Sequence, residues 1–68
     1  MKIADFNKLF PNLEFIPGTT IIMKYGSLGK ISIKPVRIRK MQTEVYIITD
    51  NSCYSLRHVK SIIEIQKP

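Results

Sequence analysis

Positively charged side chains are concentrated in the middle of this 68-residue chain. Six of them lie in the stretch from Phe15 to Thr43, which contains no Asp or Glu. They are Lys24, Lys30, Lys34, Arg37, Arg39 and Lys40. Segregated positive charge favours an anionic partner, because solubility alone does not require it. Lys and Arg neutralise phosphates, so the segment is a candidate for binding a nucleic-acid backbone.

An aromatic residue is predicted to lie beside these charges. In an extended strand Arg37 and Arg39 share one face, and Tyr46 on the following strand is predicted on the same face. An aromatic ring among cations can stack on an unpaired base. The predicted nucleic-acid-binding residues are therefore Lys24, Lys30, Lys34, Arg37, Arg39, Lys40 and Tyr46. The alternative is a solvated face on which Tyr46 packs on the arginine stems and Arg39 pairs weakly with Glu44.

Apolar residues that simple alternation leaves outside indicate a second kind of partner. They are Ile22, Leu28, Met41 and Tyr46. Exposed apolar groups near a basic rim can mark a protein interface, and Leu28 and Met41 are predicted at hairpin tips. This alternative is a protein-interaction or inhibitor module, of the kind that mobile elements encode, which binds a partner protein or a second copy of itself through hairpin tips and a sheet edge.

Cys53 and His58 are the only thiol and imidazole in the chain. A nucleophile needs a base within hydrogen-bond reach and a third group that orients the base, and no acid obviously completes such a set. One Cys and one His do not make a zinc motif. The segment GSLGK is too short for a phosphate-binding loop. We therefore expect a non-catalytic protein without metal or cofactor.

The elements that must position these residues follow from hydrophobic spacing. Ile3, Phe6 and Phe10 recur at helical intervals before Pro11, which predicts a short helix, widened by Leu9, that plugs one end of the fold. After it the period becomes two, with turn residues between the runs. The predicted strands are 13–16, 19–25, 30–40, 44–49, 53–56 and 61–65, with a glycine loop at 26–29 and a helical turn at 57–60.

Pro35 interrupts the most basic strand. Ile31 and Ile33 share a face before it, and Val36 and Ile38 form the apolar pair after it, so the parity flips and predicts a bend. A reversal centred on Met41 and Gln42 then places Val36 opposite Ile47 and Ile38 opposite Val45 inside. It places Arg37 opposite Tyr46 and Arg39 opposite Glu44 outside. Tyr54 and Leu56 are expected to point inward.

The segment from Phe15 to Ile65 resembles small SH3-like barrels of the KOW and Tudor type. Gly26, Gly29, Ile31 and Ile33 fall where such barrels carry a glycine loop before an inward-facing strand. The resemblance implies a mainly β fold, a small SH3-like barrel of five or six short antiparallel strands with a short N-terminal helix. Such barrels host many unrelated functions, so it implies a fold and no particular activity.

Length and composition set the remaining expectations. The chain has room for one domain, residues 1–68, with the helix at 1–11 and the barrel at 13–66. No stretch approaches the roughly 20 apolar residues of a membrane-spanning helix, and a single cysteine cannot form an internal disulfide. We expect a cytoplasmic binding module without a membrane partner. Its leading predicted ligand is nucleic acid, and a protein partner is the alternative.

Overall fold

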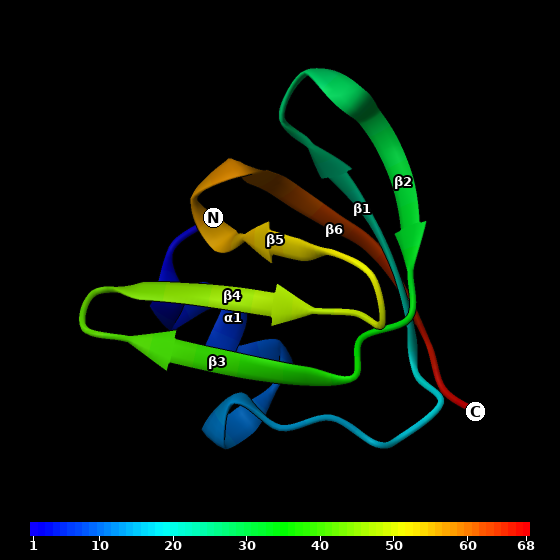
Figure 1. Cartoon of the computed structure of the whole chain (residues 1–68), viewed down its shortest axis with the longest axis horizontal. Coiled ribbons are helices and arrows are strands. Elements are labelled where there is room, and N and C mark those ends of the chain that lie inside the picture. The colour runs from blue at the N-terminus through cyan, green and yellow to red at the C-terminus, as the bar shows by residue number, and fades with distance from the viewer.

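A computed structural model describes all 68 residues (Figure 1). The chain forms one α-helix, six β-strands and three short 3-10 turns. Helix α1 spans Ile3–Leu9, and the 3-10 turns are η1 Pro11–Leu13, η2 Gly26–Leu28 and η3 Leu56–His58. The strands are β1 Thr20–Tyr25, β2 Gly29–Ile33, β3 Arg37–Met41, β4 Glu44–Ile48, β5 Cys53–Ser55 and β6 Val59–Gln66. The α-helix has seven residues, too few to span a membrane.

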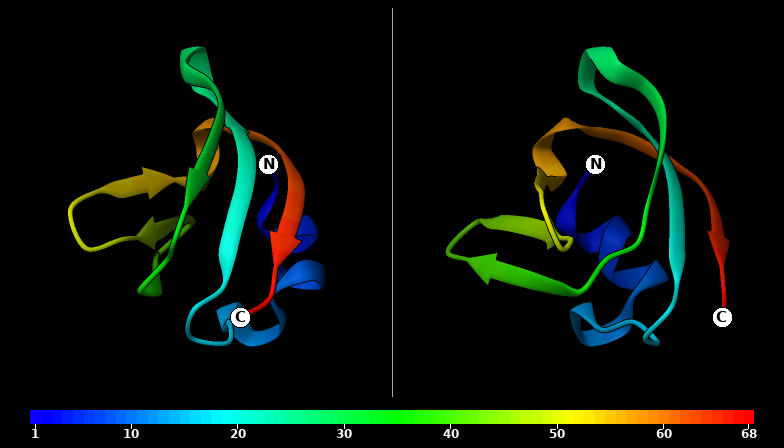
Figure 2. Two further views of the ribbon diagram at one scale, coloured as in Figure 1. Left: turned by 90° about the vertical axis from the view of Figure 1, so that its right-hand side faces the viewer. Right: turned by 45° about the vertical axis from the view of Figure 1, so that its right-hand side comes forward.

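The six strands form two antiparallel sheets of three. One sheet has the order β2-β1-β6 and the other the order β3-β4-β5. The chain crosses from the first sheet to the second between β2 and β3, and returns through η3 to β6, which pairs with β1 (Figures 1 and 2). No strand of one sheet pairs with a strand of the other, so the expected closed barrel is not formed. The fold is mainly β, as predicted, but it is two packed sheets.

The core lies between the two sheets and is completed by the helix. Ile21 and Met23 from the first sheet and Val45 and Ile47 from the second are almost fully buried in one cluster. Phe6 and Phe10 belong to the same cluster, with ring centroids 4.9 Å apart. The remaining members of the cluster are Ile33, Leu56 and Val59. The helix therefore fills the space between the sheets, although Leu9, expected to widen its apolar stripe, is 46% exposed.

The segment between α1 and β1 departs from the prediction. Residues 13–16, expected as a strand, contain the end of η1 followed by irregular backbone. Asn12 and Leu13 have φ angles of 60° and 58°, in the left-handed region that interrupts extended structure. The predicted glycine turn at 26–29 is present, and Gly26 and Gly29 supply the positive φ angles (48° and 74°) that it requires.

The predicted change of parity near Pro35 occurs, but one of its residues was misplaced. Ile33 and Pro35 are buried and Ile38 is half-buried, so Pro35 takes the inward position after Ile33. Val36, predicted inward, is 54% exposed, and its backbone N–H donates to the Ile48 carbonyl oxygen at 2.6 Å. Because two successive residues, Val36 and Arg37, lie outside, the chain turns from one sheet into the other.

The β3–β4 hairpin reverses one residue later than predicted. Its loop is Gln42 and Thr43, and Met41 pairs with Glu44, so Gln42 takes the left-handed conformation with φ 52°. The observed partners are Arg37 with Ile48, Ile38 with Ile47, Arg39 with Tyr46 and Lys40 with Val45. The register differs from the predicted one by two residues. An even shift leaves the paired residues of β3 and β4 on their predicted faces, whereas an odd shift would have exchanged the faces.

Strand β6 is longer than predicted and carries two β-bulges. Tyr25 pairs with Val59, Lys24 with Ser61, Met23 with Ile62, Ile22 with Glu64 and Ile21 with Ile65. Lys60 and Ile63 are the extra residues between these pairs. The inward positions are therefore Val59, Ile62 and Ile65, at intervals of three. The helical turn predicted at 57–60 from the spacing of Leu56, Val59 and Ile63 is replaced by η3 and the start of this bulged strand, and Ile63 is 46% exposed.

Candidate functional site

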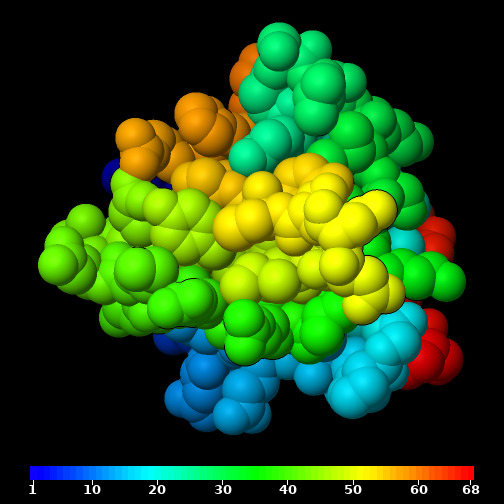
Figure 3. All heavy atoms as spheres, in the orientation of Figure 1, coloured from blue at the N-terminus to red at the C-terminus, as the bar shows by residue number.

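The outer face of the β3-β4-β5 sheet carries the main predicted site. Ile38, Val45 and Ile47 point into the core, so their neighbours along β3 and β4 point outward. Arg37 and Arg39 are exposed on this face, and Arg39 lies directly opposite Tyr46. The face is turned toward the viewer in Figures 1 and 3, with α1 behind the sheet and no other element over it. The structure thus brings together Arg37, Arg39 and Tyr46, as predicted.

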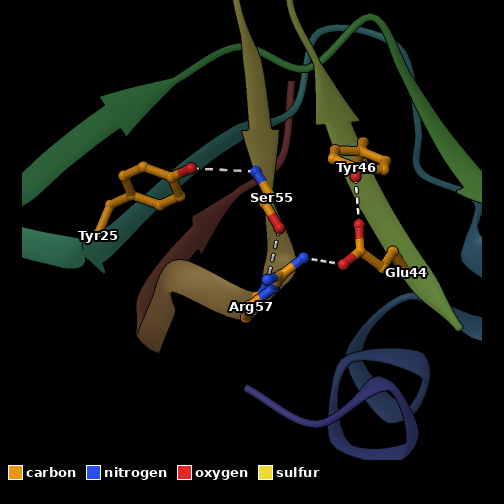
Figure 4. Close-up of polar contacts among 5 residues, drawn as sticks. All are labelled: Tyr25, Glu44, Tyr46, Ser55 and Arg57. Atoms are coloured by element: carbon orange, nitrogen blue, oxygen red, sulfur yellow. Dashed lines mark hydrogen bonds and ion pairs between the residues drawn. The ribbon is translucent and has the colours of Figure 1, made fainter.

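The one carboxylate on this face is already engaged. Glu44 accepts a hydrogen bond from the Tyr46 hydroxyl through Oε2 and forms an ion pair with Arg57 Nη2 through Oε1 (Figure 4). The predicted partner of Glu44, Arg39, is displaced by the two-residue register shift and lies opposite Tyr46. Since Arg57 compensates Glu44, the guanidinium groups of Arg37 and Arg39 have no carboxylate partner.

The remaining predicted basic residues do not lie on this face. Lys24 and Lys30 face each other across β1 and β2 in the other sheet. Lys34 lies where the chain leaves β2, lining a hollow of about 260 Å³ with Asp50 and Asn51 of the turn before β5. Lys40 lies opposite Val45 and lines a separate hollow with residues of α1 and η1, among them Ile3 and Leu13. The predicted seven-residue site is therefore divided among four places.

Lys60 is a basic residue that sequence reasoning missed. The sequence predicts a helical turn at this position, whereas Lys60 is the extra residue of a bulge in β6 and is exposed. The signal was present in the sequence as apolar residues at intervals of three, Leu56, Val59, Ile62 and Ile65, with two polar or exposed residues between each pair. Such a pattern fits a strand with regularly spaced bulges as well as a helix.

The apolar residues predicted to bind a protein partner lie apart from one another. Leu28 is 66% exposed in the turn between β1 and β2, and Met41 is 49% exposed at the end of β3. Ile22 is half-buried on the outer face of the first sheet, and Tyr46 is half-buried on the outer face of the second. They form no single surface. A groove of about 210 Å³ lies elsewhere, between η1, the following loop and β6, and is lined by Leu9, Phe10, Pro11, Phe15, Ile16 and Ile65 among others.

A cluster of aromatic rings was also missed. Tyr25 at the end of β1 packs edge-on against Tyr54 of β5 at 5.2 Å and against His58 of η3 at 5.9 Å between ring centroids. The Tyr25 hydroxyl accepts a hydrogen bond from the Ser55 backbone N–H at 3.0 Å (Figure 4). Tyr25 ends β1, about thirty residues before Tyr54 and His58, so no local pattern predicts the cluster. It ties the two sheets together at this end.

Cys53 and His58, the two residues considered for nucleophilic chemistry, occupy different elements. Cys53 is exposed on β5 opposite Ile48, on the outer face of the β3-β4-β5 sheet. His58 is exposed at the end of η3, where its ring packs against Tyr25. No group of three or more His, Cys, Asp or Glu side chains is arranged to hold a metal ion.

No family model matches the chain, and no curated protein or solved structure matches it.

Proposed function

We propose that this protein is a non-catalytic module that binds nucleic acid through the outer face of the β3-β4-β5 sheet. Arg37 and Arg39 neutralise two phosphates of the backbone. Tyr46 stacks on an unpaired base of the same strand. The observation that carries the proposal is the pairing of Arg39 with Tyr46 on a sheet face that no other element covers. A single-stranded nucleic acid suits this face best, because its bases are free to stack on an aromatic ring.

The electrostatic state of the face supports the same function. Arg37 and Arg39 are exposed and have no acidic partner, while Glu44 is held by Arg57 and Tyr46. The hydrogen bond to Glu44 also fixes the hydroxyl end of the Tyr46 ring on the sheet. A ring held in place loses less conformational freedom when a base stacks on it, which favours binding. The net charge of +6 attracts a polyanion at longer range.

We also propose that the fold is related to the SH3-like barrels that the sequence resembles. The strand order supports this relation. A bent segment contributes β2 to one sheet and β3 to the other, and a single 3-10 turn precedes the last strand, which pairs with the first. Small barrels of this kind present flat sheet faces and exposed strand edges to many kinds of ligand, so the relation is compatible with the function and does not select it.

The test is the affinity of a labelled single-stranded oligonucleotide, measured by fluorescence anisotropy over a salt series. Replacing both arginines (Arg37→Ala/Arg39→Ala) is expected to weaken binding and to reduce the salt slope by about 1.4, for two phosphates at roughly 0.7 each. The matched control is Lys8→Ala/Lys67→Ala, which removes the same charge outside this face. Equal slopes for the two double variants would contradict the proposal.

The contribution of stacking is separated by two substitutions of Tyr46. Tyr46→Ala is expected to cost about 1–3 kcal/mol of binding free energy, as the loss of one base stack does, with the salt slope unchanged. Tyr46→Phe retains the ring and loses the hydrogen bond to Glu44 that holds it in place, so its affinity should fall, but by less than that of Tyr46→Ala. A loss of the same size in both variants would show that the hydroxyl, rather than the ring, is what matters.

A protein partner is the second candidate, favoured by the apolar groove beside β6. Leu9 and Ile16 are 46% and 56% exposed at this groove. The occupant that this candidate specifies is a second copy of the chain. Sedimentation of the parent protein should then give a dimer, and Leu9→Ser/Ile16→Ser should give a monomer. A monomeric parent protein would exclude the second copy.

A further inference from the structure

We infer that a row of three lysines on the outer face of the β2-β1-β6 sheet is a second binding surface for a nucleic-acid backbone. The row is made of Lys24, Lys30 and Lys60. The inference rests on the proposed function for the class of ligand, but it concerns a different sheet. In the left panel of Figure 2, turned by 90° from Figure 1, strands β2, β1 and β6 lie side by side across the view. The two basic faces therefore look in different directions.

Strand pairing places Lys24 at the centre of the row. Lys30 on β2 is its direct partner on one side, and Ser61 on β6 is its direct partner on the other. Directly opposed residues in an antiparallel pair have Cβ atoms about 4.5–5.5 Å apart and share a face. Met23 and Tyr25, the neighbours of Lys24 in β1, point inward, so Lys24 points outward.

The bulge adds the third lysine to the row. Val59 is buried and Ile62 is half-buried against the core, and the two residues between them, Lys60 and Ser61, are both exposed. A regular strand has only one outward residue between two inward ones, so a regular β6 would leave a single residue there. The extra residue lets β6 present an ammonium group and a hydroxyl group opposite Lys24.

No carboxylate compensates these charges. The only ion pair of the structure joins Arg57 to Glu44 in the other sheet. Glu64 is on the same face as Lys24, but it lies opposite Ile22, one outward position away, and accepts a hydrogen bond from Gln66 Nε2 at 2.6 Å. Like charges placed directly opposite each other destabilise a sheet. An anion that lies across the row would relieve this repulsion. The closely spaced phosphates of a nucleic-acid duplex are an anion of this kind.

Charge complementarity and the absence of exposed aromatic rings in the row favour duplex nucleic acid. The nearest aromatic residue on β1, Tyr25, points inward and packs against Tyr54 and His58. The row and the neighbouring Ser61 therefore offer ammonium groups and a hydroxyl group, which suit phosphate oxygens and give no platform for an unpaired base. One protein molecule would hold a single strand on the β3-β4-β5 sheet and a duplex on the β2-β1-β6 sheet.

The test uses a labelled duplex DNA and the variant Arg37→Ala/Arg39→Ala, in which the first face is disabled. This variant is expected to keep saturable duplex binding with a salt slope of about −2.7, for three phosphates at roughly 0.9 each. Adding Lys24→Ala/Lys30→Ala/Lys60→Ala should abolish that binding. Adding Lys2→Ala/Lys8→Ala/Lys67→Ala, which removes three lysines outside both faces, should reduce the affinity far less. Circular dichroism of each variant establishes that it is folded.

The outcomes distinguish the inference from the proposed function. If the two triple lysine variants behave alike, the row is ordinary surface charge and the inference is overturned, whatever the arginine face does. If the row variant alone loses duplex binding while Arg37→Ala/Arg39→Ala leaves single-strand binding intact, the inference stands and the proposed function fails. A final measurement captures a labelled single strand on bead-bound duplex. The parent protein should capture it, and Lys24→Ala/Lys30→Ala/Lys60→Ala with both arginines retained should not.

Discussion

The two sheets of this protein present basic residues in different ways. In the β3-β4-β5 sheet, strands β3 and β4 pair without a bulge, alternation is regular, and the arginines share their face with a tyrosine and with a carboxylate that Arg57 compensates. In the β2-β1-β6 sheet, two bulges double the outward residues of β6, and three lysines stand together without a carboxylate partner. The bulged strand β6 thus adds a third lysine to a face on which the regular β1–β2 pairing already opposes two, whereas the regular strands β3 and β4 place their charges by alternation alone.

The largest expected difference in stability is between two single-residue deletions, one in the regular strand β4 and one in the bulged strand β6. Deleting Tyr46 from the regular strand β4 moves either Val45 or Ile47 from the core to the outer face. We expect loss of cooperative folding, because displacing a fully buried side chain costs several kcal/mol and a chain of this size has only about 5 kcal/mol to lose. Deleting Lys60 from β6 leaves Val59, Ser61 and Ile62 in a regular in-out-in order, so the core positions are kept.

The deletion of Lys60 should therefore cost only about 1 kcal/mol. Urea denaturation followed by circular dichroism measures both variants, and deletion of Ser61 serves as a control because it removes the same bulge by another residue. If the Lys60 deletion unfolds the protein as the Tyr46 deletion does, the bulge is required for the sheet, and the contrast between the two strands disappears.

The same contrast explains which parts of the structure the sequence predicts. Period-two alternation in β3 and β4 correctly placed Arg37, Arg39 and Tyr46 on one face, and it did so despite a wrong register, because the error was an even number of residues. The helix with Phe6 and Phe10 was predicted from a regular period for the same reason. Regular elements repeat one local rule, so a short sequence is enough to identify them.

The parts that were missed depend on interruptions and on contacts between distant elements. The spacing of Leu56, Val59 and Ile63 predicts a helical turn that includes Lys60, whereas Lys60 and Ile63 are the extra residues of the two bulges of β6. The predicted strand 30–40 is interrupted at Pro35 and Val36, so its two halves, β2 and β3, belong to different sheets and no closed barrel forms. The cluster joins Tyr25 to Tyr54 and His58, about thirty residues further along the chain. Hydrophobic periodicity within one element cannot predict such a contact.

A change of charge sign in the lysine row is the next prediction. Lys30→Glu places a carboxylate directly opposite Lys24 in place of a like charge. We expect the free energy of unfolding to rise by about 0.2–1 kcal/mol at low salt, the range of cross-strand charge pairs, and the gain to shrink as salt screens the pair. The measurement is urea denaturation at two ionic strengths.

The matched control for this prediction is Lys67→Glu, which changes the net charge equally but follows β6 and has no residue paired with it. Any stabilisation that it shows reflects the lower net charge of the protein rather than the row. Equal gains in Lys30→Glu and Lys67→Glu would mean that Lys24 and Lys30 do not repel each other measurably. The basis for an anion lying across them would then be weakened.

The smallest expected effect concerns Glu44 on the other sheet. Its ion pair with Arg57 is solvent-accessible, with side chains 33% and 65% exposed, so Arg57→Ala should lower stability by no more than about 1 kcal/mol. Its effect on binding should be clearer, because an uncompensated carboxylate beside Tyr46 repels the phosphates that approach Arg39. A loss of about 0.5 kcal/mol corresponds to a roughly twofold weaker affinity for single-stranded DNA.

A second substitution separates this repulsion from the simple loss of a positive charge. Glu44→Gln in the Arg57→Ala background removes the exposed carboxylate, and it should restore single-strand affinity to at least the parent value if Arg57 acts only by compensating Glu44. Glu64→Gln, on the sheet with the lysine row, should leave single-strand affinity unchanged, because Glu64 lies on a different face. If Glu44→Gln restores nothing, Arg57 contacts the nucleic acid directly, and the arginine face extends from β3 across β4 to η3.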